Sequence, residues 1–213
     1  MTTLTAVLTG DLIGSSEADP SRIDYTIAML VGAAADVTPF NRFTRYRGDG
    51  WQMFLAEPRH FLSTAVRMHA RLKADPKCLP TRISIGLGTA DYLGEDGGLG
   101  GASGTAFVNS GRALDNKLVY GGGSLLLNGE GTDDIQRSVL TFVEDRIKGW
   151  SREQAEVVAM KLTPDKDYTQ EAIAVDLGIT RQAVAARLQA AGWALVYNAC
   201  VAFHDHFAER PDA

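Results

Sequence analysis

Two aspartates, Asp11 and Asp49, occupy positions from which carboxylates can hold a metal ion. Asp11 follows the short β-branched and apolar run at residues 5–8, which predicts a first strand ending near this carboxylate. Asp49 stands between two glycines, and this Gly-Asp-Gly sequence predicts a tight hairpin turn. Taken alone, Asp49 also fits an ordinary hairpin tip, and Asp11 also fits a solvated strand end or a helix cap.

The metal interpretation follows from electrostatics. Two bare carboxylates about 4 Å apart repel by about 1 kcal/mol in water and about 4 kcal/mol at a surface-like dielectric. A divalent cation between them removes this repulsion, and Mg²⁺ and Mn²⁺ prefer such oxygen ligands. Metal ions held in this way can activate a hydroxyl group and neutralise the leaving pyrophosphate of a nucleoside triphosphate.

A sheet must bring the two aspartates together, and the pattern of apolar residues and turns predicts one. The predicted elements are a strand at 5–8, a helix from 20, strands at 40–46 and 51–55, a helix from 58, a strand at 81–88, a glycine-rich loop at 94–104, a helix at 106–119 and a strand at 124–127. The order β-α-β-β-α-β is that of the split βαβ, ferredoxin-like arrangement. We therefore expect an α+β fold, an antiparallel sheet with helices on one face, in which the hairpin turn lies beside the end of the central first strand.

The sequence pattern changes after Gly149. We expect a first domain over residues 1–149 and an all-helical second domain over residues 150–213. In the second domain one helix spans 151–163, Pro164 ends it, and three more helices follow.

Four landmarks in the first domain occur in an order that resembles class III nucleotidyl cyclases. They are Gly10-Asp11-Leu12-Ile13-Gly14-Ser15, Arg45-Tyr46-Arg47-Gly48-Asp49-Gly50, residues 83–88 and Gly104-Thr-Ala-Phe-Val-Asn-Ser-Gly-Arg112. The resemblance covers roughly residues 4–128. With its helical tail, the chain also resembles the SatD-type proteins.

The resemblance implies roles for individual residues. Asp11 and Asp49, with the Leu12 carbonyl as an extra ligand, would hold Mg²⁺ or Mn²⁺, and Arg45 or Arg47 would contact phosphate or a base edge. Arg112 would offset the charge that develops on the phosphoryl group, and Asn109 is the second candidate catalytic residue. In the family one subunit supplies the metals and the other supplies the Arg helix, so the resemblance implies a homodimer.

Three departures from the family pattern affect substrate choice. Arg45 replaces the base-reading Lys, and Val108 falls on the family's Asn position, which places Asn109 one residue late. The carboxylate that selects the base before the glycine turn is missing, because Gly101 and Ala102 occupy that region.

Composition excludes several classes of protein. The chain has 213 residues, 45% hydrophobic and 22% charged, which is typical of a globular protein, and its net charge of −5 argues against a polyanion as the main partner. The two cysteines, Cys78 and Cys200, form neither a disulfide framework nor a zinc motif. No signal sequence and no run of about 18 apolar residues occurs, so we expect a cytoplasmic protein without membrane contact.

Residues 168–188 resemble the helix-turn-helix of bacterial transcription regulators. Thr169 and Thr180 are suited to cap two helices, and Gly178 permits the tight turn between them. The outward residues Arg181, Gln182 and Arg187, with Thr180, are the candidate DNA contacts. Residues 151–213, however, hold six basic and nine acidic groups, a balance that supplies little attraction for DNA phosphates. A helical packing or regulatory module therefore stays open as the alternative.

Two hypotheses about function result. In the first, the chain binds a nucleoside triphosphate and converts it to a cyclic nucleotide with two divalent metals. In the second, it is a catalytically degenerate nucleotide sensor that passes its signal to a DNA-binding helix-turn-helix. The retained Asp11, Asp49 and Arg112 favour the first, whereas Val108 and the missing base-selecting carboxylate favour the second.

Overall fold

The computed structural model describes residues 3–35, 37, 41–46, 48–95, 97–115, 123–164 and 168–208. Its strands are β1 (Thr5–Leu12), β2 (Asn41–Tyr46), β3 (Gly50–Leu55), β4 (Thr81–Gly88) and β5 (Leu125–Gly129). Its helices are α1 (Pro20–Ala35), α2 (Phe61–Ala74), α3 (Thr105–Asp115), α4 (Asp134–Gly149), α5 (Arg152–Lys161), α6 (Gln170–Leu177), α7 (Arg181–Ala190) and α8 (Trp193–Ala208), with short 3-10 helices η1 (Ser15–Glu17) and η2 (Pro58–His60). None of these described helices is both long and apolar enough to cross a membrane.

The five strands form one sheet in the order β2-β3-β1-β4-β5. The first four strands pair antiparallel, in the strand order of a split βαβ arrangement with β1 near the centre. β5 adds to β4 in parallel, so the sheet is mixed and not wholly antiparallel. The α+β class is confirmed.

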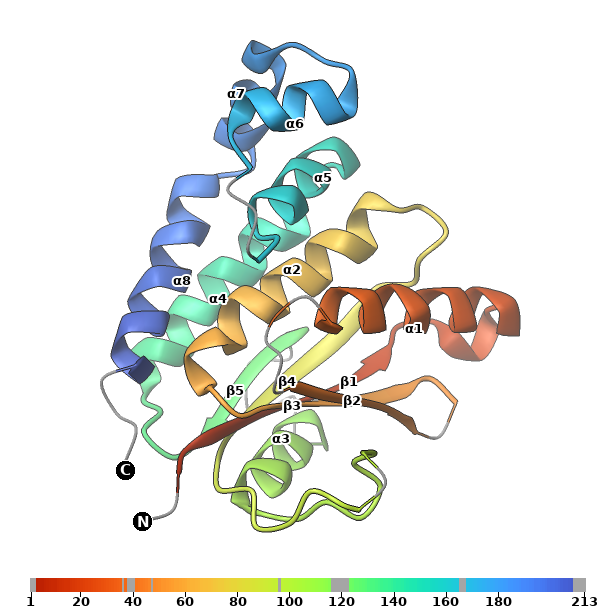
Figure 1. The fold of residues 1–213 in the computed structure, drawn as a ribbon, viewed down its shortest axis with the longest axis vertical. Coiled ribbons are helices and arrows are strands. Elements are labelled where there is room, and N and C mark those ends of the chain that lie inside the picture. Colours follow the sequence, from red (N-terminus) through yellow and green to blue (C-terminus); the bar gives the residue numbers. More distant parts are fainter. Residues whose placement is uncertain are drawn as a thin grey trace.

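Helices cover both faces of the sheet, so the expectation of helices on one face is wrong. α1 and α2 lie on one face and α3 on the other (Figure 1). The α3 face has a small core of its own, built around Val7, Phe54, Leu99 and Ala106. The physical reason lies in β4, where Gly86 leaves so little side-chain volume that the backbone of α3 can approach the sheet.

Helix α4 was not among the predicted elements, although its start carries a local signal. Asp133 accepts a hydrogen bond from the backbone N–H of Gln136, and the Gln136 side chain accepts one from the backbone N–H of Asp133. This reciprocal pair is a capping box with Asp in place of Ser or Thr. Of the predicted helix at 106–119, residues 106–115 belong to α3; residues 116–119 lie outside the described residues, as does Phe40 of the predicted strand at 40–46.

The C-terminal helices continue the main core. Phe61 at the start of α2 packs against Phe203 and Phe207 of α8, with ring centroids 5.5 and 5.4 Å apart. The indole N–H of Trp150 donates to the Ala191 carbonyl at 2.8 Å. Buried residues of α5, α7 and α8 belong to the same hydrophobic cluster as those of the sheet and α2. Apolar packing is therefore continuous across the change in sequence pattern at Gly149.

A buried polar cluster lies where α2, α4 and β5 meet. The Glu144 carboxylate is 6% exposed, pairs with Lys148 at 2.7 Å and accepts a hydrogen bond from the Ser124 hydroxyl at 2.9 Å. Burial acts to raise the pKa of Glu144, but the bonds from Lys148 and Ser124 outweigh it and lower the pKa. Nearby, burial lowers the pKa of His69 from 6.5 to about 4.

This histidine predicts a loss of stability in mild acid. The folded protein holds His69 neutral, so its contribution is complete above pH 6.5 and is lost as the pH falls toward 4. The shift corresponds to about 3 kcal/mol in the free energy of unfolding. Denaturant titrations at pH 7 and pH 4.5 should show this loss in the wild type and a smaller one in His69→Phe. The pKa of His60 is also lowered, mainly by burial, so His60→Gln should reduce the loss as well. A loss that persists undiminished in His69→Phe contradicts the assignment.

Candidate functional site

Asp11 and Asp49 lie at the same end of the sheet. Asp11 is the penultimate residue of β1, and Asp49 is in the turn that joins β2 to β3. Because Gly10 of β1 pairs with Trp51 of β3, the ladder register carries the hairpin turn to the end of β1. Asp49 accepts a hydrogen bond from the hydroxyl of Ser15, in the segment that directly follows β1.

The two carboxylate oxygens of Asp11 have different environments. One oxygen, Oδ2, accepts a hydrogen bond from Nη1 of Arg82 at 2.8 Å, in an ion pair whose side chains are 33% and 28% exposed. The other oxygen, Oδ1, is buried and has no hydrogen-bond partner among the described residues. A buried polar atom without a partner is uncommon in a folded protein, so this oxygen is a candidate ligand-binding atom.

Several contacts hold the end of β1 in place. The hydroxyl of Thr81 donates to the backbone carbonyl of Asp11 at 2.7 Å and accepts from the indole N–H of Trp51 at 3.0 Å. The Trp51 ring is fully buried and stacks on Phe43, with centroids 5.6 Å apart. The backbone that carries Asp11 is thereby tied to the adjacent strands on both sides.

The donor set fits a divalent cation. Asp11 Oδ1 and the Asp49 carboxylate are hard oxygen donors, and the Leu12 carbonyl adds a third candidate from the same strand end. Among the described residues no group of three or more His, Cys, Asp or Glu side chains is placed to hold a metal ion. An ion at this site would therefore need backbone, water or phosphate oxygens as further ligands, as Mg²⁺ commonly does.

Arg82 is the site residue that sequence reasoning missed. It lies in β4 directly opposite Asp11, and its guanidinium neutralises the carboxylate that the metal would use. The only signal was its place as a charged residue in an otherwise apolar and small-residue strand. Recognising Asp11 as its partner requires the register between β1 and β4. The sequence does not show this register, because the two residues are about seventy positions apart.

The structure does not bring Arg45 together with Asp11. Arg45 is the cross-strand partner of Trp51, whose side chain lies in the core under α1 and α2, and it pairs with Asp24 of α1 at 2.7 Å. Asp11 is one residue past the β1 partner of Trp51, so its side chain points to the opposite face. Arg47 lies outside the described residues.

Helix α3 carries the two candidate catalytic residues. Asn109 uses its side-chain N–H to bond the Leu87 carbonyl at 2.8 Å, which commits this amide to the backbone of β4. Ser110 bonds Thr9 of β1 at 2.8 Å, while Val108 is exposed. Arg112 is exposed further along the helix, which runs from the far end of β4 toward the end that carries Asp11.

The four candidate DNA contacts all lie at the start of α7 or within it. Thr180 caps α7, since its side chain accepts from the backbone N–H of Ala183 at 3.1 Å, and Gln182 is exposed. Arg181 is 63% exposed and lies 3.3 Å from Glu171; Arg187 is less exposed and lies 3.3 Å from Glu156. Both arginines therefore have an acidic neighbour within the chain.

Comparison with known proteins found no matching family model and no matching curated protein. Among solved structures, the chain is similar to two structures of a bacterial light-regulated adenylyl cyclase, at 13% identity, with TM-scores of 0.37 and 0.38. Each similarity covers 60% of this chain and 43% of the other, so this chain spans less than half of the length of those proteins. A similarity of this size identifies neither a family nor an activity.

Proposed function

We propose that the chain binds a nucleoside triphosphate together with Mg²⁺ or Mn²⁺ at the end of β1, and that it forms a cyclic nucleotide there. The ribose 3′-hydroxyl would attack the α-phosphate, and pyrophosphate would leave. The single observation that carries this proposal is the buried Asp11 oxygen without a partner, beside a turn that holds a second carboxylate, Asp49. A divalent cation would satisfy that oxygen and would in turn attract the triphosphate.

Each residue would have a defined task. Asp11 and Asp49 would hold the cation, with the Leu12 carbonyl as an additional ligand. The bound metal would supply charge neutralisation for the triphosphate and activation of the attacking hydroxyl. Arg112, supplied by the second copy of a homodimer, would offset negative charge on the phosphoryl group.

The residues proposed to read the nucleotide are Arg47 and Asn109. Arg45 points to the face opposite Asp11 and pairs with Asp24, so it is left out of the proposed site. Asn109 would have to release the Leu87 carbonyl to reach a ligand.

Turnover is tested by incubating the pure protein with Mn²⁺ and each of the four ribonucleoside triphosphates. We expect a cyclic product from at least one nucleotide, detected by chromatography and mass spectrometry, and no product from Asp49→Ala. Product that survives in Asp49→Ala would come from a contaminant or another site and would contradict the proposal.

Arg82 should compete with the metal for Asp11. Removing its charge in Arg82→Met leaves the Asp11 carboxylate without an internal cation, so Mn²⁺ should bind more tightly, by up to about fivefold, as exposed or half-exposed ion pairs are worth up to about 1 kcal/mol. Free Mn²⁺ measured by electron paramagnetic resonance gives the affinity. The matched control is Arg146→Met, which removes an arginine paired with a surface aspartate of α4. Weaker binding in Arg82→Met would mean that Arg82 orients Asp11 for the metal.

The second candidate function is a nucleotide sensor without turnover. The observation that favours it is the commitment of Asn109 to the Leu87 carbonyl, which leaves the α3 amide without access to a ribose. Buried residues of α5 and α7 share the main core with α2, so a change at the sheet could reach the proposed helix-turn-helix of α6 and α7 through packed side chains.

The sensor hypothesis includes DNA binding through Thr180, Arg181, Gln182 and Arg187. A mobility-shift assay at moderate salt on DNA from upstream of the protein's own gene tests it, with and without nucleotide. We expect a shift that Arg181→Ala weakens, since this exposed arginine stands at the start of α7. Unchanged mobility with the wild-type protein would remove the DNA-binding proposal and leave the nucleotide proposal intact.

A further inference from the structure

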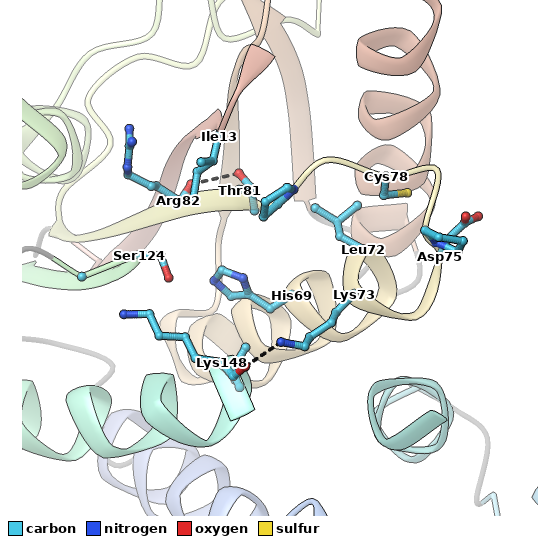
Figure 2. A pocket seen from close by; sticks show the side chains of 14 residues that line it. Ile13, His69, Leu72, Lys73, Asp75, Cys78, Thr81, Arg82, Ser124 and Lys148 are labelled. Carbon is cyan, nitrogen blue, oxygen red and sulfur yellow. Dashed lines mark hydrogen bonds between the residues drawn. The ribbon is translucent and has the colours of Figure 1, made fainter. Parts of the chain in front are cut away.

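A cavity of about 520 Å³ lies between α2, the end of α4 and the first residues of β4, away from Asp49. Much of its wall is apolar and comes from Ile13, Leu72, Cys78, Pro80 and Ile147. Its volume is within the range of small-molecule sites, which are mostly apolar with a few convergent polar groups. Figure 2 shows that His69 and Lys73 of α2 reach this cavity from one side and Lys148 of α4 from below, while the Arg82 guanidinium points away.

His69 contributes an unsatisfied acceptor. The residue is 8% exposed, and within the part of the chain that the structure describes its buried Nε2 atom has no hydrogen-bond partner. The imidazole donates a hydrogen bond to the backbone of Ser124 through its other nitrogen, Nδ1. In the neutral ring Nε2 therefore carries the lone pair. A ligand that offers a hydroxyl or N–H group to Nε2 would satisfy it.

Lys73 contributes a positive charge one helical turn after His69. Its ammonium donates one hydrogen bond to the Lys148 carbonyl at 2.7 Å, and within the described part of the chain no carboxylate pairs with it. The neighbouring ammonium of Lys148 is already neutralised by Glu144. Partial burial lowers the pKa of Lys73, which means that its charge is poorly solvated and would gain from an anionic partner.

We infer that this cavity binds a small organic monocarboxylate that has an apolar body and a hydroxyl group at its other end. Lys73 pairs with the carboxylate, His69 Nε2 accepts the hydroxyl proton in a hydrogen bond, and the apolar wall covers the body of the ligand. The Lys73 ammonium is the one that no carboxylate neutralises among the described residues of this cavity. A single positive charge matches a monocarboxylate better than it matches a phosphate dianion.

This inference does not rest on the proposed nucleotide site. Arg82, which pairs with Asp11, also lines the cavity, but neither His69 nor Lys73 is a proposed metal or nucleotide ligand. Its test uses the full chain and three probes of one shape in isothermal titration calorimetry. They are 4-hydroxybenzoate, benzoate, which lacks the hydroxyl group, and 4-hydroxybenzyl alcohol, which lacks the charge. We expect 4-hydroxybenzoate to bind at least about tenfold more tightly than either of the others, as a charge-assisted or buried hydrogen bond contributes on that scale.

Two variants separate the roles of the polar groups. Lys73→Met should remove the preference for the acid over the alcohol, and His69→Phe should remove the preference for 4-hydroxybenzoate over benzoate. The matched control is Lys77→Met, which removes a lysine that does not line this cavity and should leave all three affinities unchanged. No binding of 4-hydroxybenzoate at millimolar concentration, equal affinity for the three probes, or full affinity in Lys73→Met would each overturn the inference.

Discussion

Replacing Asp11 by asparagine should weaken metal-dependent nucleotide binding by about 100-fold, which corresponds to ~2.7 kcal/mol. Asparagine keeps the volume of the side chain and can still accept a hydrogen bond from Arg82, so the fold should survive the change. It removes the negative charge that would hold the cation through the buried Oδ1 atom. Calorimetric titration of each nucleoside triphosphate in Mn²⁺, and again in a chelator, measures the effect.

The control for this prediction is a surface aspartate with an arginine partner of its own. Asp145→Asn on α4 removes a carboxylate paired with Arg146 at 2.9 Å and should leave nucleotide affinity unchanged. Asp49→Asn should weaken binding to a similar extent as Asp11→Asn, because both would serve the same ion. Equal nucleotide affinity in wild type and Asp11→Asn would show that the end of β1 takes no part in binding.

Gly86→Ala should cost about 3 kcal/mol or more in the free energy of unfolding. A Cβ atom at this position of β4 would lie 2.2 Å from the Ala106 carbonyl oxygen and 2.3 Å from the Ser110 amide nitrogen, both backbone atoms of α3. No side-chain rotation can relieve such contacts, so the helix must move off the sheet. For a chain of this size, differential scanning fluorimetry should show a fall in melting temperature of roughly 6–12 °C.

The matched control is Gly111→Ala, on the same helix. Beyond its chain neighbours and the backbone of its own helix, a Cβ atom at Gly111 meets no described atom within 4 Å, and alanine favours a helix over glycine, so this variant should keep or slightly raise the melting temperature. The displaced α3 of Gly86→Ala should also impair any role of Arg112, even though residue 86 touches no ligand. An unchanged melting temperature in Gly86→Ala would mean that α3 does not pack as closely as described.

Local patterns in the sequence predicted much of the fold. The Gly-Asp-Gly turn, the caps at Thr169 and Thr180 and the left-handed Gly178 are interactions among neighbouring residues, and the structure contains each of them. The capping box at Asp133 was equally local and was missed, because Asp replaces the usual Ser or Thr.

Features that depend on strand register were not predictable from the pattern. The pairing of Arg82 with Asp11, the opposite direction of Arg45 and the placement of α3 on the second face all follow from which residues face each other across the sheet. The glycine-rich stretch itself packs through Leu99, which is buried beside Val7 and Phe54 and donates its N–H to Thr44. None of these contacts leaves a periodic trace in the sequence.

In the proposed site, Asp11 and Asp49 jointly hold a divalent cation at the end of β1. Crystals grown with Mn²⁺ and a non-hydrolysable nucleoside triphosphate, measured at a wavelength where manganese scatters anomalously, test it directly. We expect an anomalous peak in contact with Asp11 Oδ1 and an Asp49 carboxylate oxygen, with the triphosphate on its open side. A bound nucleotide whose metal lies elsewhere, or an Asp11 still paired only with Arg82 at saturating Mn²⁺, would contradict the claim.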